Sequence, residues 1–230
     1  MSEWIEASAF FGVLISLAGY ELGMVLKRKF GWALLNPLLV AVCFVTAVLL
    51  CLDVDYGAYE EGAKYLSYLL TPATVCLAVP LYQQLELLKK NWKAVLGGIL
   101  AGTLASLVSV LALSALFGLT HEQYVTLLPK SITTAIGMGV SEELGGIVTL
   151  TVASIVVTGI LGSILAEGLC RWMHITHPIA KGLALGTSAH AIGTAKALEM
   201  GEVEGAMSGL AIAVAGLITV VGASVFAQFL

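Results

Sequence analysis

Apolar residues form long stretches along almost the whole chain. Four stretches of about 20 residues cover positions 4–26, 32–52, 64–88 and 93–118. At a rise of about 1.5 Å per residue, each is long enough for a helix to cross about 30 Å of hydrocarbon. The pattern therefore predicts four plain transmembrane helices in the first half. The first stretch lacks a basic segment in front of it, so we expect a retained span and not a signal peptide.

The second half alternates smooth and interrupted apolar stretches. Residues 145–172 and 203–230 again predict plain spans. Residues 122–143 and 178–200 are apolar enough to enter a membrane, but Gly, Ser, Thr, Lys and His punctuate them. Unpaired backbone groups are tolerated at membrane depth only where protein or a water-filled cavity surrounds them. These two segments therefore predict broken helices inside the protein.

The two interrupted stretches resemble each other. Residues 133–137 (TTAIG) align with residues 189–193 (AHAIG), and the same offset of 56 residues matches Glu143 with Glu199 and Gly145 with Gly201. A fainter similarity links GILAGTLA at 98–105 with GILGSILA at 159–166. The constant register predicts an internal structural repeat, and paired broken segments are typical of transport sites.

Basic residues orient the chain. The clusters Lys27–Lys29 and Lys89–Lys93 place two joints between spans in the cytoplasm, and the N-terminus outside. Two topologies remain open for the broken segments. If both cross the membrane, the chain has eight spans. If both are re-entrant hairpins, it has six, and the hairpins enter from opposite faces.

Composition supports an integral membrane protein. The chain has 230 residues, of which 59% are hydrophobic and 11% charged, and its mean hydropathy is +0.97. We expect an all-helical polytopic fold of one transmembrane domain, 1–230, with plain spans over 1–118 and the broken pair over 119–230. The net charge of −4 argues against nucleic-acid binding. The four cysteines lie in apolar runs and predict no disulfide framework.

Catalytic and metal-binding patterns are not evident. The sequence contains no HExxH, GxSxG or Walker glycine loop. His174 and His177 alone make a poor metal site. We therefore expect no enzyme activity, no cofactor and no bound metal.

The first interruption, LPKSITT at 128–134, has the chemistry of an anion site. A helix that starts inside the membrane presents free amides and a partial positive charge. Lys130 adds a full positive charge, and Ser131, Thr133 and Thr134 add hydroxyls. We predict that these four residues bind a carboxylate, with Gly137 supporting them.

The second interruption centres on His190. Thr187, Ser188 and Thr194 lie beside it in the sequence and are predicted to bind the substrate. Histidine has a reference pKa of about 6.5, so His190 is a candidate for proton coupling. The alternative is a neutral histidine that donates one bond to a neighbouring helix. The predicted supporting residues are Gly193, Lys196 and Asn36, although Lys196 could instead extend to the membrane surface.

Several blocks resemble the LrgB/CidB family of bacterial membrane proteins, which includes YohK-type members and the related plastid glycolate/glycerate translocators. They occur in order between about residues 30 and 209, and comprise NPLLVA (36–41), LAVPLY (77–82), LPKSITT (128–134), GLALGT (182–187) and HAIGTA (190–195). Two departures are Ala135, where the family usually has proline, and the order Ser188–Ala189. They affect the expected local geometry of the breaks.

The resemblance implies a multi-pass protein of the bacterial inner membrane. Relatives are described as antiholin-like modulators of murein hydrolase activity, often with a small holin-like partner of the LrgA/CidA type, and some are linked to small monocarboxylates. We therefore expect a carrier for glycolate, glycerate or pyruvate-like acids in a lipid bilayer. The alternative is a holin-like pore or regulatory component. Four GxxxG spacings favour dense helix packing, within one protomer or in a homo-oligomer.

Overall fold

The computed structural model describes residues 10–32, 34–76 and 78–230, and throughout these ranges the regular structure is helical. The chain divides into two compact units, Met1–Cys76 and Leu77–Leu230, which are described separately. The expected all-helical fold is confirmed.

The first unit is built on a pair of packed helices. Its helices are α2 (Phe11–Phe30), α3 (Pro37–Leu52), α4 (Tyr56–Ser67) and α5 (Leu70–Cys76). Gly19 and Gly23 of α2 lie against α3, where a Cβ at Gly23 would lie 2.6 Å from Cα of Pro37. Asn36 begins α3, because its side chain accepts bonds from the amides of Leu38 and Leu39.

The third predicted span, residues 64–88, is interrupted, as its prolines Pro72 and Pro80 favour. The described part of this stretch is divided among α4, α5, α6 (Ala78–Gln83) and the first residues of the next helix, which begins at Leu85. Pro72 and Pro80 are each the third residue of a short helix. An amide at that position would have no hydrogen-bond acceptor within the helix, so the proline costs the helix no hydrogen bond. The lysines at 89–93, expected in a joint between spans, lie inside the next helix.

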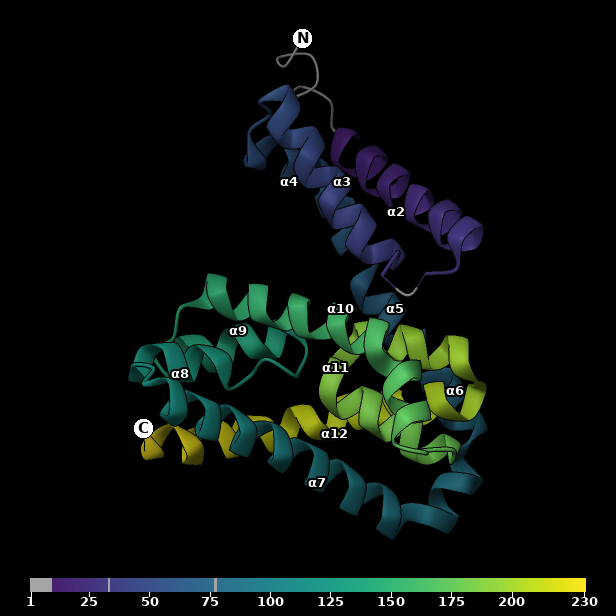
Figure 1. Cartoon of the computed structure of the whole chain (residues 1–230), viewed down its shortest axis with the longest axis vertical. Coiled ribbons are helices and arrows are strands. Elements are labelled where there is room, and N and C mark those ends of the chain that lie inside the picture. The colour runs from purple at the N-terminus through teal and green to yellow at the C-terminus, as the bar shows by residue number, and fades with distance from the viewer. Residues whose placement is uncertain (1–9, 33, 77) are drawn as a thin grey trace. The chain divides into compact units, whose positions relative to one another are not determined.

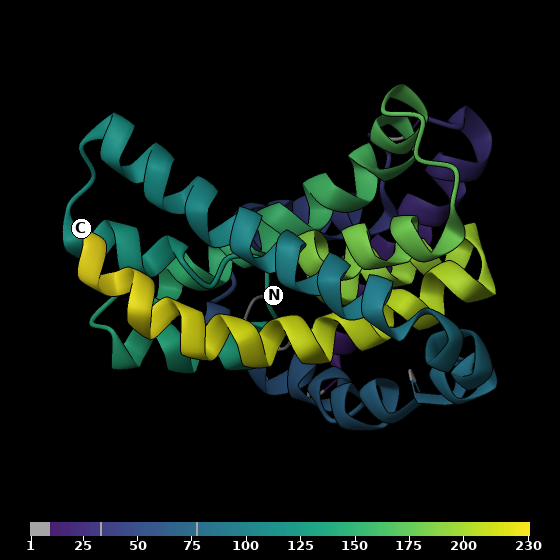
Figure 2. The same cartoon turned by 90° about the horizontal axis from the view of Figure 1, so that it is seen from below.

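Three long helices form the frame of the second unit (Figure 1). They are α7 (Leu85–Phe117), α10 (Val148–Trp172) and α12 (Glu202–Phe226), with a short η1 (Ala227–Phe229) after the last. Among the described residues, these three are the helices long and apolar enough to cross a membrane. Figure 2 shows α7 and α12 lying alongside each other. They run in the same direction, since Val95 packs near Met207 while Leu107 lies beside Gly222.

The first interrupted segment forms a re-entrant hairpin, which we call hairpin 1 (residues 121–143). It consists of α8 (His121–Leu127), a non-helical tip and α9 (Thr134–Glu143). One hydroxyl, Oγ1 of Thr151 near the start of α10, binds both arms: it donates to the carbonyl of Thr126 at 2.9 Å and lies 2.6 Å from Oγ of Ser141. Both arms therefore return to the same end of α10.

The second interrupted segment, α11 (Pro178–Met200), is also a hairpin, which we call hairpin 2. Figure 1 shows α11 doubling back on itself. A Cβ at Gly193 would lie 2.9 Å from the carbonyl oxygen of Leu185, eight residues earlier. In a continuous helix these positions would be about 12 Å apart. Both arms pack on α12 at the same level, where Ser208 contacts Gly186 and Thr194.

The two hairpins enter the second unit from opposite ends. Ile179, in the first arm of hairpin 2, packs with Val95 near the start of α7. Tyr124 of hairpin 1 instead donates its hydroxyl to the carbonyl of Phe226, at the far end of α12. Both broken segments therefore double back as hairpins and do not cross from one end of the unit to the other.

The predicted repeat is visible in equivalent contacts. In the first copy of the repeat, the carbonyl of Thr126 in hairpin 1 accepts a hydrogen bond from Thr151 of α10. At the same offset of 56 residues, Gly182 of hairpin 2 faces Met207 of α12, where a Cβ on the glycine would lie 2.9 Å from Cβ of Met207. Because the hairpins enter from opposite ends, the repeat is inverted, as in many transporters.

Candidate functional site

The tip of hairpin 1 is a tight, buried turn. Residues 128–133 are not helical. The amide of Lys130 bonds to the carbonyl of Leu127 at 3.2 Å, and the amide of Ile132 bonds to that of Pro129 at 3.2 Å. Proline at 129 helps to end α8, because it has no backbone amide to continue the hydrogen bonds of the helix. Ser131 is buried and Lys130 is half-buried, so the tip holds its polar side chains inside the protein.

The tip of hairpin 2 is a two-residue break at Ala189 and His190. His190 has φ 41° and ψ −140°, a backbone conformation that favours glycine. Such a conformation costs a non-glycine residue about 1–3 kcal/mol and persists where the surrounding structure imposes it. A histidine held in this conformation and only 3% exposed is therefore a candidate for function and not for stability.

Helix α7 brings the two tips together. Oγ of Ser106 lies 3.0 Å from Oγ of Ser131 in hairpin 1. One turn earlier on the same face, a Cβ at Gly102 would lie 2.6 Å from Oγ1 of Thr187 in hairpin 2. Only glycine at 102 allows this approach. Residues from the two broken segments thus lie within about one helical turn of each other, roughly 5–6 Å, along α7.

Helix α10 joins the tips from a second side. Ile155 is fully buried, and its Cδ1 would lie 2.5 Å from a Cβ at Gly137 in hairpin 1. Its carbonyl oxygen lies 2.9 Å from Nε2 of His190 in hairpin 2. The same residue of α10 therefore contacts both hairpins. Gly137 is a packing position directly behind the first tip.

Lys130 is a cation without a carboxylate partner among the residues that the structure describes. Its ammonium donates to Oγ of Ser131 at 3.0 Å. Ser131 in turn bonds to Ser106, which lies near the middle of the apolar part of α7. A charge at this depth is costly unless a counter-charge offsets it. The arrangement favours binding of an anion.

The serine pair retains one free hydroxyl proton. Ser131 accepts from Lys130, because an ammonium can only donate. Ser106 and Ser131 together have two protons, and one of them lies between the two oxygens. The other has no acceptor in the described structure. It is available to a polar substituent of a bound anion.

The start of α9 adds donors beside these side chains. Thr133 occupies the N-cap of α9 but makes no side-chain bond to the helix amides. The amides of the first turn, including that of Thr134, therefore keep their partial positive charge. Thr133 and Thr134 are both half-buried.

The histidine makes one fixed bond. Because a carbonyl oxygen only accepts, Nε2 of His190 carries the proton in its contact with Ile155. The ring lies over Gly159, where a Cβ would be 2.6 Å from Cε1. The alternative considered from sequence, a histidine that donates to a neighbouring helix, matches this contact. The same contact leaves Nδ1 as the atom at which a proton could be gained or lost.

The other hydroxyls predicted for hairpin 2 point to different places. Oγ1 of Thr187 donates to the carbonyl of Leu183 at 2.8 Å, and its oxygen faces Gly102. Oγ of Thr194 is fully buried and lies 2.7 Å from Oγ of Ser208, so it fastens hairpin 2 to α12. Ser188 is exposed and bonds back to Ala184 at 2.6 Å. The tip residues thus bring Thr187, but not Ser188, toward α7.

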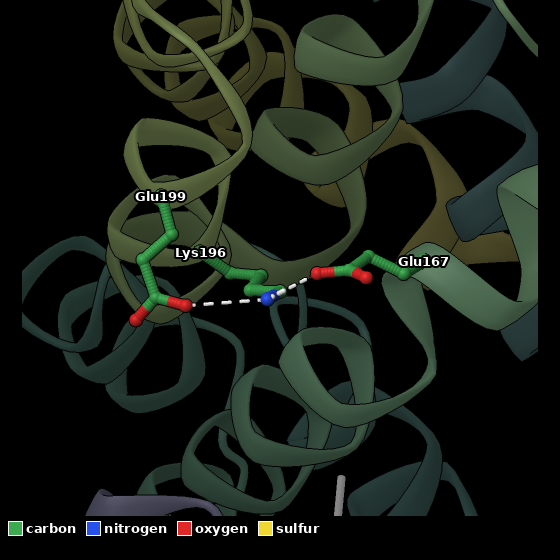
Figure 3. A network of polar contacts seen from close by, with 3 residues as sticks. All are labelled: Glu167, Lys196 and Glu199. Carbon is green, nitrogen blue, oxygen red and sulfur yellow. Dashed lines mark hydrogen bonds and ion pairs between the residues drawn. The ribbon is translucent and has the colours of Figure 1, made fainter. Parts of the chain in front are cut away.

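The predicted supporting residues each make different contacts. Gly193 packs against Leu185 at the hairpin turn. Lys196 lies between two carboxylates, 2.5 Å from Oε1 of Glu167 and 3.2 Å from Oε2 of Glu199 (Figure 3). It fastens the second arm of hairpin 2 to α10. Asn36 belongs to the first unit, where it caps α3.

Two residues of α7 were missed by sequence reasoning. Ser106 contacts Ser131 directly. Thr103 is 2% exposed, and its Oγ1 has no hydrogen-bond partner among the described residues. Both follow the Gly98/Gly102 pair in an otherwise apolar span. Their position directly after a close-packing glycine pair was the feature of the sequence that could have identified these two hydroxyls.

A groove of ≈ 500 Å³ leads toward the tips. It lies between α7 and the first arm of hairpin 2. Asn91 and His177 line one end, and Gly102 and Thr187 line the other. The groove therefore runs from the lysine-bearing end of α7 to the contact between α7 and the second tip.

Comparison with known proteins identifies the family of the chain. The model of the LrgB-like family matches residues 16–229. The chain is 38% identical over 222 residues to "Antiholin-like protein LrgB" of Bacillus mycoides (strain KBAB4), with 96% of each chain covered. It is 37% identical, with the same coverage, to the proteins of that name from Bacillus cereus (strain B4264) and Bacillus anthracis (strain CDC 684 / NRRL 3495).

No solved structure matches the chain. The family model spans α2 to η1, so it includes both hairpins and the α7 face that joins them. The resemblance seen in the sequence is confirmed by this match and by the bacterial relatives. The chain belongs to the LrgB-like family.

Proposed function

We propose that this chain is a secondary transporter of small monocarboxylates of the glycolate, glycerate or pyruvate type, in the bacterial inner membrane. The observation that carries the proposal is the pair of oppositely inserted hairpins meeting at one face of α7. Inverted hairpins around a buried polar site are the architecture expected of alternating access. In this proposal no bond of the substrate is made or broken.

Lys130 would hold the carboxylate. The free amides at the start of α9, next to Thr133 and Thr134, would share its charge. The hydroxyl pair of Ser131 and Ser106 would bind an oxygen elsewhere on the acid, because one proton of that pair is free. A small acid fits this arrangement, since the groups that bind it lie close together.

Hairpin 2 would supply the side chain whose protonation changes with pH. Nδ1 of His190 is the atom at which protonation could change, because Nε2 is bonded to Ile155. A proton taken up with the anion would make the transported pair neutral and lower the cost of crossing the bilayer. Thr187 would contact the substrate from the same hairpin, beside Gly102.

The groove between α7 and hairpin 2 would be the route to the site from the lysine-bearing end. Lys89 and Lys90 at that end favour a cytoplasmic location. Hairpin 1 enters from the opposite end, so the outward route would open beside it. Small movements of one hairpin against α7 and α10 would then alternate access to the same residues.

The test is uptake by proteoliposomes that contain the purified full chain. Radiolabelled glycolate and pyruvate should enter in a saturable manner, at a rate that depends on the pH gradient. Lys130→Ala should reduce uptake to the background of protein-free vesicles. Lys89→Ala, which removes a lysine outside the site, is the matched control and should transport normally. Undiminished uptake by Lys130→Ala would overturn the assigned role.

A second candidate is an antiholin-like role, which the printed names of the Bacillus relatives favour. In that case contacts with a small holin-like membrane partner, or with further copies of this chain, would carry the function. Leakage of an encapsulated dye separates the two candidates. A carrier retains the dye while acids enter, whereas a non-selective pore releases it.

A further inference from the structure

A second cavity lies outside the transport site, at the connection between α10 and α11. It is open to the surface and has a volume of ≈ 580 Å³. Arg171 from the last turn of α10, His174 and Thr176 from the connection, and Lys181 from the first turn of α11 line it, together with Glu167. Cationic side chains therefore approach the same space from two helices, on either side of the connecting loop.

The two permanent cations of this cavity are not neutralised by the chain. Within the described residues, neither Arg171 nor Lys181 forms an ion pair. Glu167 is the one carboxylate among the described lining residues, and it already binds Lys196 on the second arm of hairpin 2 (Figure 3). The cavity therefore retains positive charge.

Two backbone carbonyls at the end of α10 are already hydrogen-bonded within the chain. His174 has φ 56° and ends α10 with a left-handed turn. The amide of Ile175 bonds to the carbonyl of Cys170 at 2.8 Å, and that of His174 bonds to the carbonyl of Arg171 at 3.2 Å. The carbonyls of Cys170 and Arg171 are thus occupied. His177, the N-cap of α11, makes no side-chain bond, so the positive end of that helix adds to the field.

The cavity lies at the depth of lipid headgroups. Trp172 ends the membrane-spanning α10 and is 76% exposed, as is usual for tryptophan at a membrane–water interface. Ile179 packs with Val95, so the cavity is at the lysine-bearing end of α7. This is the end that positive-inside counting assigns to the cytoplasm, where the leaflet is anionic.

We propose that this cavity binds a phosphate-bearing anion between Arg171 and Lys181. A guanidinium can bind two phosphate oxygens with parallel hydrogen bonds, and an ammonium adds a point charge from the facing helix. The phosphate could belong to an anionic phospholipid headgroup or to a soluble phosphate. The ligand would lie beside the Glu167–Lys196 contact, which fastens hairpin 2 to α10.

The test measures the thermal unfolding midpoint of the purified full chain in a neutral maltoside detergent. Dihexanoyl-phosphatidylglycerol, dihexanoyl-phosphatidylcholine and sodium phosphate are titrated separately at constant ionic strength. We expect phosphatidylglycerol to raise Tm saturably by a few degrees, because a ligand that binds only the folded state stabilises it. Phosphatidylcholine, whose headgroup is zwitterionic, should have a much smaller effect.

The variants locate the effect. Arg171→Gln with Lys181→Gln should abolish the shift, whereas Lys89→Gln with Lys90→Gln, at the same end of the molecule, should retain it. Arg171→Lys keeps the charge and loses the two-pronged geometry, so it should weaken apparent affinity by about 10-fold. Arg171→Lys also tests the site if the double variant does not fold.

Each outcome decides the proposal. An equal shift with sodium phosphate identifies a soluble phosphate as sufficient, and a shift with phosphatidylglycerol alone identifies the lipid. Either result supports the site. No saturable shift in the unmodified chain, or a shift that survives both the double variant and Arg171→Lys unchanged, would overturn it.

Discussion

The hydroxyl of Ser106 on α7 lies 3.0 Å from the hydroxyl of Ser131 at the tip of hairpin 1. This contact connects a helix that looked featureless in sequence to the most polar break in the chain. It also places the partner of Lys130 one turn from Gly102, against which hairpin 2 packs. The proposed site depends on this face of α7.

Replacing Ser106 tests whether its hydroxyl contributes to substrate binding. Ser106→Ala should raise the KM for glycolate by about 10-fold, the effect of losing one net hydrogen bond of about 1–1.5 kcal/mol. Ser109→Ala is the matched control, because Ser109 is exposed and bonds back to the carbonyl of Ala105. Uptake kinetics in proteoliposomes provide the measurement. Equal KM values for the two variants would remove Ser106 from the site.

The backbone conformation of His190 predicts that a glycine variant is more stable than an alanine variant at this position. At φ 41°, alanine keeps the strain that glycine avoids. Both His190→Gly and His190→Ala lose the imidazole and its bond to Ile155, so comparing them isolates the strain. The glycine variant should be more stable by about 1 kcal/mol. Thermal unfolding in detergent measures the difference, and a more stable alanine variant would contradict the assigned turn.

The same position tests proton coupling. His190→Gly removes the only titratable ring at the second tip but leaves Lys130 and the serine pair in place. Glycolate uptake by this variant should continue at a reduced rate and lose its dependence on pH between about 5.5 and 7.5. Uptake at a series of pH values gives the profile. A pH dependence like that of the unmodified protein would assign the coupling to another group.

Sequence reasoning located the breaks more precisely than it described their surroundings. Pro129, Lys130 and the repeated TTAIG/AHAIG pattern identified both tips, since polar and helix-breaking residues are conspicuous in apolar stretches. Whether the segments cross or return was not predictable. Both topologies need the same apolar content, and only long-range contacts such as Gly193 to Leu185 distinguish them.

The contacts of individual side chains could not be predicted from the sequence either. Ser106 lies in a span whose pattern fits an ordinary lipid-exposed helix, and its contact with Ser131 depends on the fold of hairpin 1. Lys196 follows the second break closely in sequence, yet the return of hairpin 2 carries it to Glu167. Local periodicity does not encode which helix a hairpin arm will face.

Close packing of hairpin 2 on α12 predicts a sharp dependence on Gly186. A Cβ there would lie 2.7 Å from Cβ of Ala211 and closer still to the carbonyl of Ser208. Gly186→Ala should therefore lower stability by about 1–3 kcal/mol, the usual cost of overpacking. Gly97→Ala is the control, because nothing lies within 4 Å of its Cβ position. Comparable unfolding midpoints for both variants would contradict the packing.

The most direct test of the central claim is oxidative cross-linking of both hairpin tips to α7, in a chain whose four native cysteines are replaced by serine or alanine. The pairs Ser106→Cys/Ser131→Cys and Gly102→Cys/Thr187→Cys lie close enough for a disulfide. Ser109→Cys/Ser131→Cys, with one cysteine on the exposed face of α7, is the control. We expect rapid cross-linking of both test pairs in membranes and little of the control. Failure of either test pair, or equal cross-linking of the control, would show that the two breaks do not share one site.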